Sequence, residues 1–278
     1  MDTIEVTIDL NPKDPWSEIL IAELAENGFD SFVTTDSGIK AYASQDIAVA
    51  SVLEQSILSR APKIEYSIRS EVIPYQNWNA VWEANFKPVH IDDVASILAP
   101  FHNRDLGKGV IVEIQPQMSF GTGHHETTWM MVKAMFAIKD FPSNVLDMGT
   151  GTGVLAIFAE KLGAGAILAV DNDEGSVQNA LENGDRNETN NIEFVYGSIN
   201  AVKDKNFGLI IANINKNILK EQMETYSNIL EADGVLLLSG FLCSDVDEMV
   251  EYASSFDFSL QNSYKKNEWA GIQFQKSN

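Results

Sequence analysis

Cysteine is almost absent from this chain of 278 residues. Only Cys243 occurs, so no disulfide can form within the molecule and no cysteine cluster can hold a metal. Basic residues are also scarce, with 19 Lys and Arg against 40 Asp and Glu and a formal net charge of -21. Neutralising a phosphate backbone needs clustered Lys and Arg, so this balance disfavours direct binding to nucleic acid. It favours a cationic partner or substrate instead.

Long apolar runs are missing as well. Stretches such as residues 234–242 are far shorter than the roughly 20 residues of a membrane-spanning helix. The opening residues 1–5 carry neither the basic nor the apolar region of a signal peptide. We therefore expect a soluble cytoplasmic protein with no membrane partner. The oligomeric state stays open at this point, with a monomer favoured.

The first 73 residues have a pattern of their own. Apolar and polar residues alternate as in a half-buried strand at Ile4, Val6, Ile8 and Leu10. The expected elements that follow are a helix capped by Asp14 and ended by Gly28, strands at 32–33 and 39–43, a helix capped by Asp46, and a strand near 64–73. The order β-α-β-β-α-β predicts a small α+β, ferredoxin-like domain over residues 1–73.

The next segment, residues 74–109, reads as a helical connector. Apolar residues at helical spacing predict one short amphipathic helix, carried by Trp78, Val81, Trp82 and Phe86. Pro88 and Pro100 then interrupt any regular element. Residues 110–278 are expected to form a separate domain.

Short apolar runs alternate with helical stretches in that second domain. The runs lack alternation, which is typical of strands buried on both faces of a parallel sheet, and they lie at 145–146, 167–170, 192–196, 209–212 and 235–238. Two closing strands are expected at 258–264 and 269–275. The sequence thus predicts a seven-stranded, doubly wound, Rossmann-like α/β domain.

The strongest motif is the loop Asp147-Met-Gly149-Thr-Gly151-Thr-Gly153, placed between a buried strand and a helix. Glycines at such a place let the backbone turn sharply and approach a ligand closely. Gly149 and Gly151 are the glycines expected to lie against this ligand. Asp171 ends the next strand, where a carboxylate can accept hydrogen bonds from both hydroxyls of a ribose. Loop, strand and acid together predict a nucleoside-containing cofactor.

Two cofactor classes compete for this loop. Gly151-x-Gly153-x-x-Ala156 fits the dinucleotide fingerprint, which would make the protein an NAD-binding oxidoreductase. The same loop also reads Asp-x-Gly-x-Gly-x-Gly, a pattern typical of S-adenosylmethionine enzymes. Because that cofactor carries an ammonium and a sulfonium rather than a pyrophosphate, nearby carboxylates suit it better. We favour S-adenosylmethionine.

Upstream lies a second motif, FGTGHHETT, residues 120–128. Its glycines suggest a tight loop and its two threonines the start of a helix. A metal site made of His124, His125 and Glu126 is disfavoured, because adjacent side chains rarely converge on one ion; we expect no metal. The alternatives are a helix start capped by hydroxyls and a loop folded over the cofactor pocket.

A third feature is Asn213, at the end of the strand 209–212. Ligands in open α/β sheets bind beyond the carboxyl ends of the strands, which places Asn213 near a reacting centre. Its amide oxygen could accept a hydrogen bond from a nucleophilic amine and aim the nitrogen lone pair. The alternative is an Asn that only forms a turn.

Taken together, these segments resemble the PrmA family, the bacterial methyltransferases of large-subunit ribosomal protein eleven. FGTGHHETT is the most specific segment, and it is joined by Asn77-Trp78, Phe86-Lys87-Pro88, the 147–153 loop, Asp171-Asn-Asp173, Ala212-Asn-Ile214 and Leu238-Ser-Gly240. Gln117, Ser119 and Asn215 depart from the family pattern at the edge of the pocket.

The resemblance implies N-methylation of ribosomal protein eleven, at lysine side chains and the terminal amine, from S-adenosylmethionine. It implies that the N-terminal domain recognises the protein substrate and that the connector lets the catalytic domain reach several amines. It also implies that Thr128, Gly149, Asp171 and Asn213 contact the cofactor. Other protein or small-amine substrates, or a non-enzymatic adaptor that binds the same cofactor, remain as alternatives from the residues alone.

Overall fold

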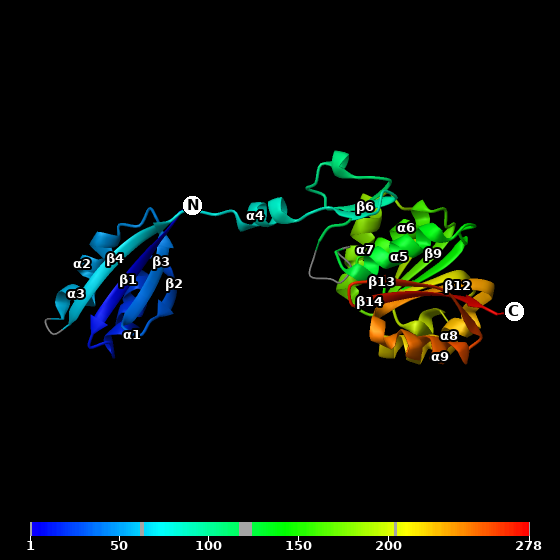
Figure 1. The fold of residues 1–278 in the computed structure, drawn as a ribbon. Coiled ribbons are helices and arrows are strands. Elements are labelled where there is room, and N and C mark those ends of the chain that lie inside the picture. Colours follow the sequence, from blue (N-terminus) through cyan, green and yellow to red (C-terminus); the bar gives the residue numbers. More distant parts are fainter. Residues whose placement is uncertain (1, 62–63, 117–123, 203–204, 278) are drawn as a thin grey trace. The chain divides into compact units, whose positions relative to one another are not determined.

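The computed structural model describes residues 2–61, 64–116, 124–202 and 205–277 (Figure 1). Its internal contacts divide the chain into two compact units, Met1–Asn85 and Phe86–Asn278. Residues 120–123 of the FGTGHHETT motif lie outside the described residues, as do Gln117 and Ser119. None of the helices within the described ranges is long and apolar enough to span a membrane.

The first unit is an antiparallel sheet covered on one face by helices. Its strand order is β2-β3-β1-β4, and its elements are β1 (Thr3–Asn11), α1 (Trp16–Glu26), β2 (Phe29–Thr34), β3 (Gly38–Ser44), α2 (Val49–Gln55), α3 (Ile57–Arg60), β4 (Glu65–Ile73) and α4 (Trp78–Asn85). The alternating residues Val6, Ile8 and Leu10 are buried beneath the helices with Leu20 and Leu24 of α1. The predicted order of elements is therefore present, with two short helices, α2 and α3, where one was expected.

Two helix caps of the first unit differ from the prediction. Pro15, not Asp14, occupies the N-cap position of α1, and no side chain caps that helix. Ala48 stands at the N-cap of α2, so Asp46 does not cap it. Asp14 lies one residue before the N-cap position of α1, and Asp46 lies two residues before that of α2. Neither carboxylate therefore caps the first free N–H groups of its helix.

The second unit is built on a seven-stranded sheet of order β10-β9-β8-β11-β12-β14-β13. Five strands are parallel, namely β8 (Asn144–Met148), β9 (Ala166–Asp171), β10 (Ile192–Tyr196), β11 (Phe207–Asn213) and β12 (Leu230–Leu242). The hairpin of β13 (Phe258–Lys266) and β14 (Trp269–Lys276) joins β12 antiparallel. The chain runs from β8 to β9 on one side and continues at β11 on the other, so the strand order reverses at β8.

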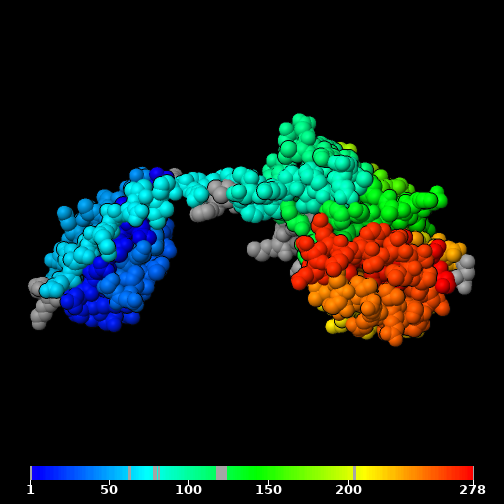
Figure 2. All heavy atoms as spheres, in the orientation of Figure 1, coloured from blue at the N-terminus to red at the C-terminus, as the bar shows by residue number. Residues whose placement is uncertain are grey.

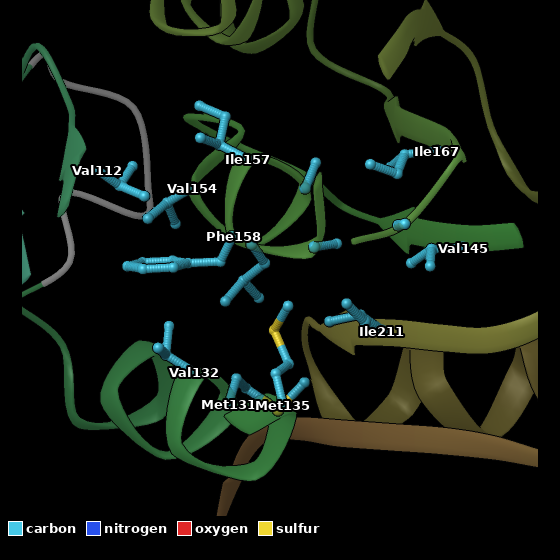
Figure 3. Packing of buried hydrophobic residues seen from close by; sticks show 14 of the residues in the cluster. Val112, Met131, Val132, Met135, Val145, Val154, Ile157, Phe158, Ile167 and Ile211 are labelled. Carbon is cyan, nitrogen blue, oxygen red and sulfur yellow. The ribbon is translucent and has the colours of Figure 1, made fainter. Parts of the chain in front are cut away.

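Helices cover both faces of this sheet. One face packs α5 (Glu126–Ala137), α6 (Val154–Lys161) and α7 (Glu174–Arg186); the other packs α8 (Lys216–Ile229) and α9 (Val246–Ser254) (Figure 1). Figure 3 shows the first of these layers, where Met131 and Met135 of α5, Phe158 of α6, and Val145 and Ile211 of the sheet belong to one core. The central strands β8, β9 and β11 are buried on both sides, which explains their uninterrupted apolar runs.

Residues 86–113 form more regular structure than the connector prediction, which ended at residue 109, allowed. The strands β5 (Val89–Ile91), β6 (Ala95–Leu98) and β7 (Val110–Glu113) make a separate three-stranded sheet. Ile91 and Ile97 are buried in the core of the second unit. This part of the predicted connector therefore belongs to the second unit, because short strands that supply two or three buried side chains leave little periodicity to read.

Candidate active site

The glycine loop 149–153 turns the chain from β8 into α6. Gly149, Gly151 and Gly153 have φ angles of 75°, 55° and 80°, a region that side chains with a Cβ rarely adopt. A Cβ at Gly149 would come within 2.2 Å of the Cγ2 atom of Ile214. The loop therefore depends on glycine both for its backbone angles and for its close packing on the turn that follows Asn213.

Asp147, the acid before the first glycine, supports this loop from inside. It is 1% exposed, and its Oδ2 atom accepts the Thr150 hydroxyl at 2.7 Å and the Ala156 N–H at 3.1 Å. Burial raises the pKa of its carboxyl to about 7, against the lowering effect of those two hydrogen bonds. Its Oδ1 atom is buried and has no hydrogen-bond partner among the described residues. Asp147 thus holds the loop together, and it does not offer an open carboxylate to a ligand as its place in the motif suggested.

Asp171 ends β9 and is only half-buried. Its Oδ2 atom accepts the Gly151 N–H at 2.8 Å, and its Oδ1 atom accepts the Asp173 N–H at 3.0 Å. A carboxylate has about four acceptor positions, so each oxygen keeps capacity for a further donor. Two neighbouring hydroxyls, as on a ribose, fit that remaining capacity.

The backbone N–H groups of the loop are used within the protein. Those of Gly149 and Thr150 donate to the Val170 carbonyl, that of Gly151 to Asp171, and that of Gly153 to the Thr150 carbonyl. Pyrophosphate sites at helix N-termini rely on free N–H groups directed at the phosphate. With four N–H groups engaged and no Lys or Arg in residues 147–153 or 171–174, the loop fits a ligand without phosphate better than a dinucleotide.

Asn213 is the last residue of β11, on the other side of β8 from Asp171. The turn after it is tightly built: Asn215 caps α8 by accepting the Asn217 N–H, and Gly240 of β12 packs on Ile214. A Cβ at Gly240 would lie 2.2 Å from the Ile214 carbonyl oxygen. Ile214 is therefore held between Gly149 and Gly240, which fixes the strand end that carries Asn213.

Strand alternation places the polar groups on one face of the sheet. Asp171 follows Ile167 and Ala169 at two-residue steps, and Asn213 follows Leu209 and Ile211. These four apolar residues all belong to the core layer between the sheet and helices α5 and α6. Side chains two residues apart lie on the same side of a strand, so both groups lie on the α5–α6 face. The strands that carry these residues, β9 and β11, are two strand spacings apart, or about 10 Å.

Thr128 lies in the first turn of α5, the helix on this same face, and is 1% exposed. The helix is capped by His125, whose ring nitrogen accepts the Thr127 N–H, rather than by a hydroxyl. The His125 ring also packs 4.6 Å from Trp269, whereas His124 bonds to the Lys87 carbonyl at 2.8 Å. The two histidines thus have separate structural partners, and within the described ranges no cluster of three or more potential metal ligands is found.

Comparison with known proteins decides the family. The model of the ribosomal protein L11 methyltransferase (PrmA) family matches residues 13–277. The ribosomal protein L11 methyltransferase of Porphyromonas gingivalis is 41% identical over 263 residues, covering 92% of this chain and 90% of that protein. The chain belongs to the PrmA family. A second relative of the same name, from Phocaeicola vulgatus, is 35% identical and covers 99% of both chains.

One solved structure agrees with this family. The ribosomal protein L11 methylase of Lactobacillus delbrueckii subsp. bulgaricus has 26% identity and a TM-score of 0.64, covering 69% of this chain and all of that one. As a member of the PrmA family the chain is a methyltransferase that uses S-adenosylmethionine, which confirms the favoured cofactor and removes the NAD alternative.

Sequence reasoning missed two asparagines at the end of α7, one of which supports the glycine loop. Asn183 of α7 is fully buried; it donates to the Thr152 carbonyl of the glycine loop at 3.0 Å and accepts the Gln115 N–H at 2.8 Å. One turn later, Asn187 pairs with both backbone groups of Glu113. The available signal was two asparagines four residues apart on a helix, a spacing that places them on one face.

A hollow of about 500 Å³ lies elsewhere in the second unit. It is lined at the amino ends of the strands, by residues that include Asn144, Ala166, Ile192 and Phe207. Asp171 and Asn213 end their strands at the opposite, carboxyl edge. Because ligands of open α/β sheets bind at that carboxyl edge, the hollow is not part of the candidate active site.

Proposed function

We propose that this chain transfers methyl groups from S-adenosylmethionine to amines of ribosomal protein L11, at lysine side chains and the N-terminus. The proposal depends on one observation: Asp171 and Asn213 end the two strands that flank β8, and both lie on the same face of the sheet. The names of the relatives supply the substrate.

Five residues would hold the cofactor. Asp171, with acceptor capacity left on both oxygens, would bind the ribose hydroxyls. Gly149 and Gly151 would allow close approach of the backbone, and Thr128 and Asn213 would border the pocket from α5 and β11. The four loop N–H groups engaged within the protein, and the lack of Lys or Arg in residues 147–153 and 171–174, agree with a ligand that is positively charged and lacks phosphate.

Asn213 is the proposed catalytic residue. When bound, S-adenosylmethionine would supply a methyl group on a sulfonium sulfur, which leaves as a neutral thioether when a nucleophile bonds to the methyl carbon. The Asn213 amide oxygen would accept an N–H of the attacking amine and orient its lone pair. A free lysine has a pKa of about 10.4, so the amine must lose a proton before it attacks. Partial burial beside Asn213 favours the neutral amine, and release of the proton to water requires no general base from the chain.

The first unit supports a role in recognition. Its antiparallel order β2-β3-β1-β4 and its β-α-β-β-α-β connectivity support the ferredoxin-like domain that we propose for it. We assign substrate recognition to residues 1–73, linkage to residues 74–85 and catalysis to residues 86–278. The protein would act as a monomer in the cytoplasm, without binding nucleic acid directly, on a substrate whose basic character suits the charge of -21.

Two single variants test the site. Asp171→Ala should weaken S-adenosylmethionine at least about 10-fold in calorimetry, because it removes two charge-assisted hydrogen bonds. Asn213→Ala should lower kcat on purified L11 by about 100-fold, the scale of a lost positioning contact, with smaller change in cofactor affinity. Unchanged affinity in the first variant, or unchanged turnover in the second, would refute the corresponding role.

A further inference from the structure

The sheet of the first unit has two edges that differ sharply. At one edge, β2 has six residues and its pairing with β3 is irregular between Phe29 and Ser31. At the other edge, β4 has nine residues in unbroken register with β1, and all nine are exposed. Proteins commonly protect sheet edges with short strands and bulges. The β2 edge has that protection, and the β4 edge lacks it (Figure 1).

An apolar row runs along β4 on the helix-covered face. Tyr66, Ile68 and Val72 pair in register with Leu10, Ile8 and Ile4, so they continue the face of the buried core. Yet Tyr66, Ile68 and Val72 are 48%, 37% and 42% exposed. On this face α1 packs against β2 and β3, toward the opposite edge of the sheet. In Figure 2 the spheres of this strand lie open along the margin of the unit. Apolar rows of this kind mark interaction sites.

Charge identifies the occupant of this edge. Residues 1–85 contain 14 Asp and Glu against 5 Lys and Arg, a net charge of -9. On the other face of β4 and its neighbours, Lys40 and Arg69 are already paired with Glu5 and Asp9, which leaves Glu65 and Glu71 in excess. A second copy of this acidic chain would be repelled, whereas a basic protein would be attracted.

We propose that β4 binds an extended segment of the basic protein substrate as a fifth strand of the sheet. Backbone hydrogen bonds along the open edge would supply affinity, and alternate apolar side chains of the segment would pack on Tyr66, Ile68 and Val72. The inference rests on the proposed function, since it takes L11 as the substrate. It adds the surface and the mode by which that substrate is held.

Kinetics on purified L11 with the full-length chain tests the proposal. Ile68→Lys should raise KM for L11 about 10-fold with little change in kcat, the effect of losing one buried aliphatic contact. Val33→Lys is the matched control, because Val33 is 49% exposed on the other edge strand and the added charge is the same. The double variant Tyr66→Ser, Val72→Ser should also raise KM, without any added charge.

Three other results would overturn it. Equal KM values for Ile68→Lys and Val33→Lys would mean that the edge does not bind the substrate. A wild-type dimer in sedimentation that Ile68→Lys dissociates, with KM unchanged, would make a second copy the occupant. No methylation of L11 by the wild-type chain, with S-adenosylmethionine binding intact, would instead refute the proposed function and with it the choice of occupant.

Discussion

Asp147 has a carboxyl group whose surroundings differ strongly from water. Its carboxyl is buried beneath the glycine loop, and burial raises its pKa from an ordinary 3.8 to about 7. The fold therefore favours the protonated form. Stability from this group is fully present below about pH 4 and is lost as the pH rises toward about 7, a difference on the order of 4 kcal/mol.

Asp147→Asn removes this proton linkage while keeping an oxygen for Thr150 and Ala156. We expect the free energy of unfolding of the wild type to fall, relative to that of the variant, as the pH rises from about 4 to about 7, and the difference to level off above that. Urea unfolding of both proteins across this range measures it. The exposed Asp185→Asn controls for net charge; parallel curves for wild type and Asp147→Asn would contradict the account.

At the scale of elements, the Asn213 strand end depends on how closely β12 approaches it. Gly240 and Gly163 have similar φ angles, 97° and 105°, but only Gly240 has neighbours that a Cβ would strike. Gly240→Ala should therefore destabilise the protein more than Gly163→Ala, which carries only the backbone strain of about 1–2 kcal/mol. It should also lower methyl transfer by displacing Asn213. Equal losses of stability, measured by denaturant unfolding, would show that the contact with Ile214 is unimportant.

Helix α7 is tied to the glycine loop through Asn183. Replacing Asn183 with Leu keeps the volume but leaves the Thr152 carbonyl and the Gln115 N–H without this partner, at a cost of about 2–4 kcal/mol. We expect weaker S-adenosylmethionine binding as well, because Thr152 belongs to the loop. Gln178→Leu, on the exposed side of the same helix, is the control for both unfolding and calorimetry. If Asn183→Leu and Gln178→Leu bind S-adenosylmethionine equally well, Asn183 has no role in cofactor binding.

How far the sequence predicts these elements depends on how their residues are buried. The strands of the large sheet were predicted within a few residues, because burial on both faces leaves unbroken apolar runs such as 209–212. The small sheet of β5, β6 and β7 was missed, since strands of three or four residues show no period. The inward direction of Asp147 and the bonds of Asn183 arise from neighbours distant in sequence, which no local pattern encodes.

At the scale of the whole molecule, the negative charge of the chain favours association with a basic substrate. The chain has a formal net charge of -21. The residues that define the candidate site include no Lys or Arg, and the cations beside the β4 edge, Lys40 and Arg69, are paired with carboxylates. A basic substrate is therefore attracted over distances comparable to the Debye length, about 8 Å at physiological ionic strength. Methylation at substrate concentrations below KM should slow as salt is added.

Methyl transfer to L11 can be measured by intact mass spectrometry of a total ribosomal-protein extract incubated with the purified chain and S-adenosylmethionine. We expect mass increments of whole methyl groups on ribosomal protein L11, with Asn213→Ala giving far smaller increments over the same time. If the chain binds S-adenosylmethionine but L11 gains no mass, the proposal that its amines are the substrate is wrong.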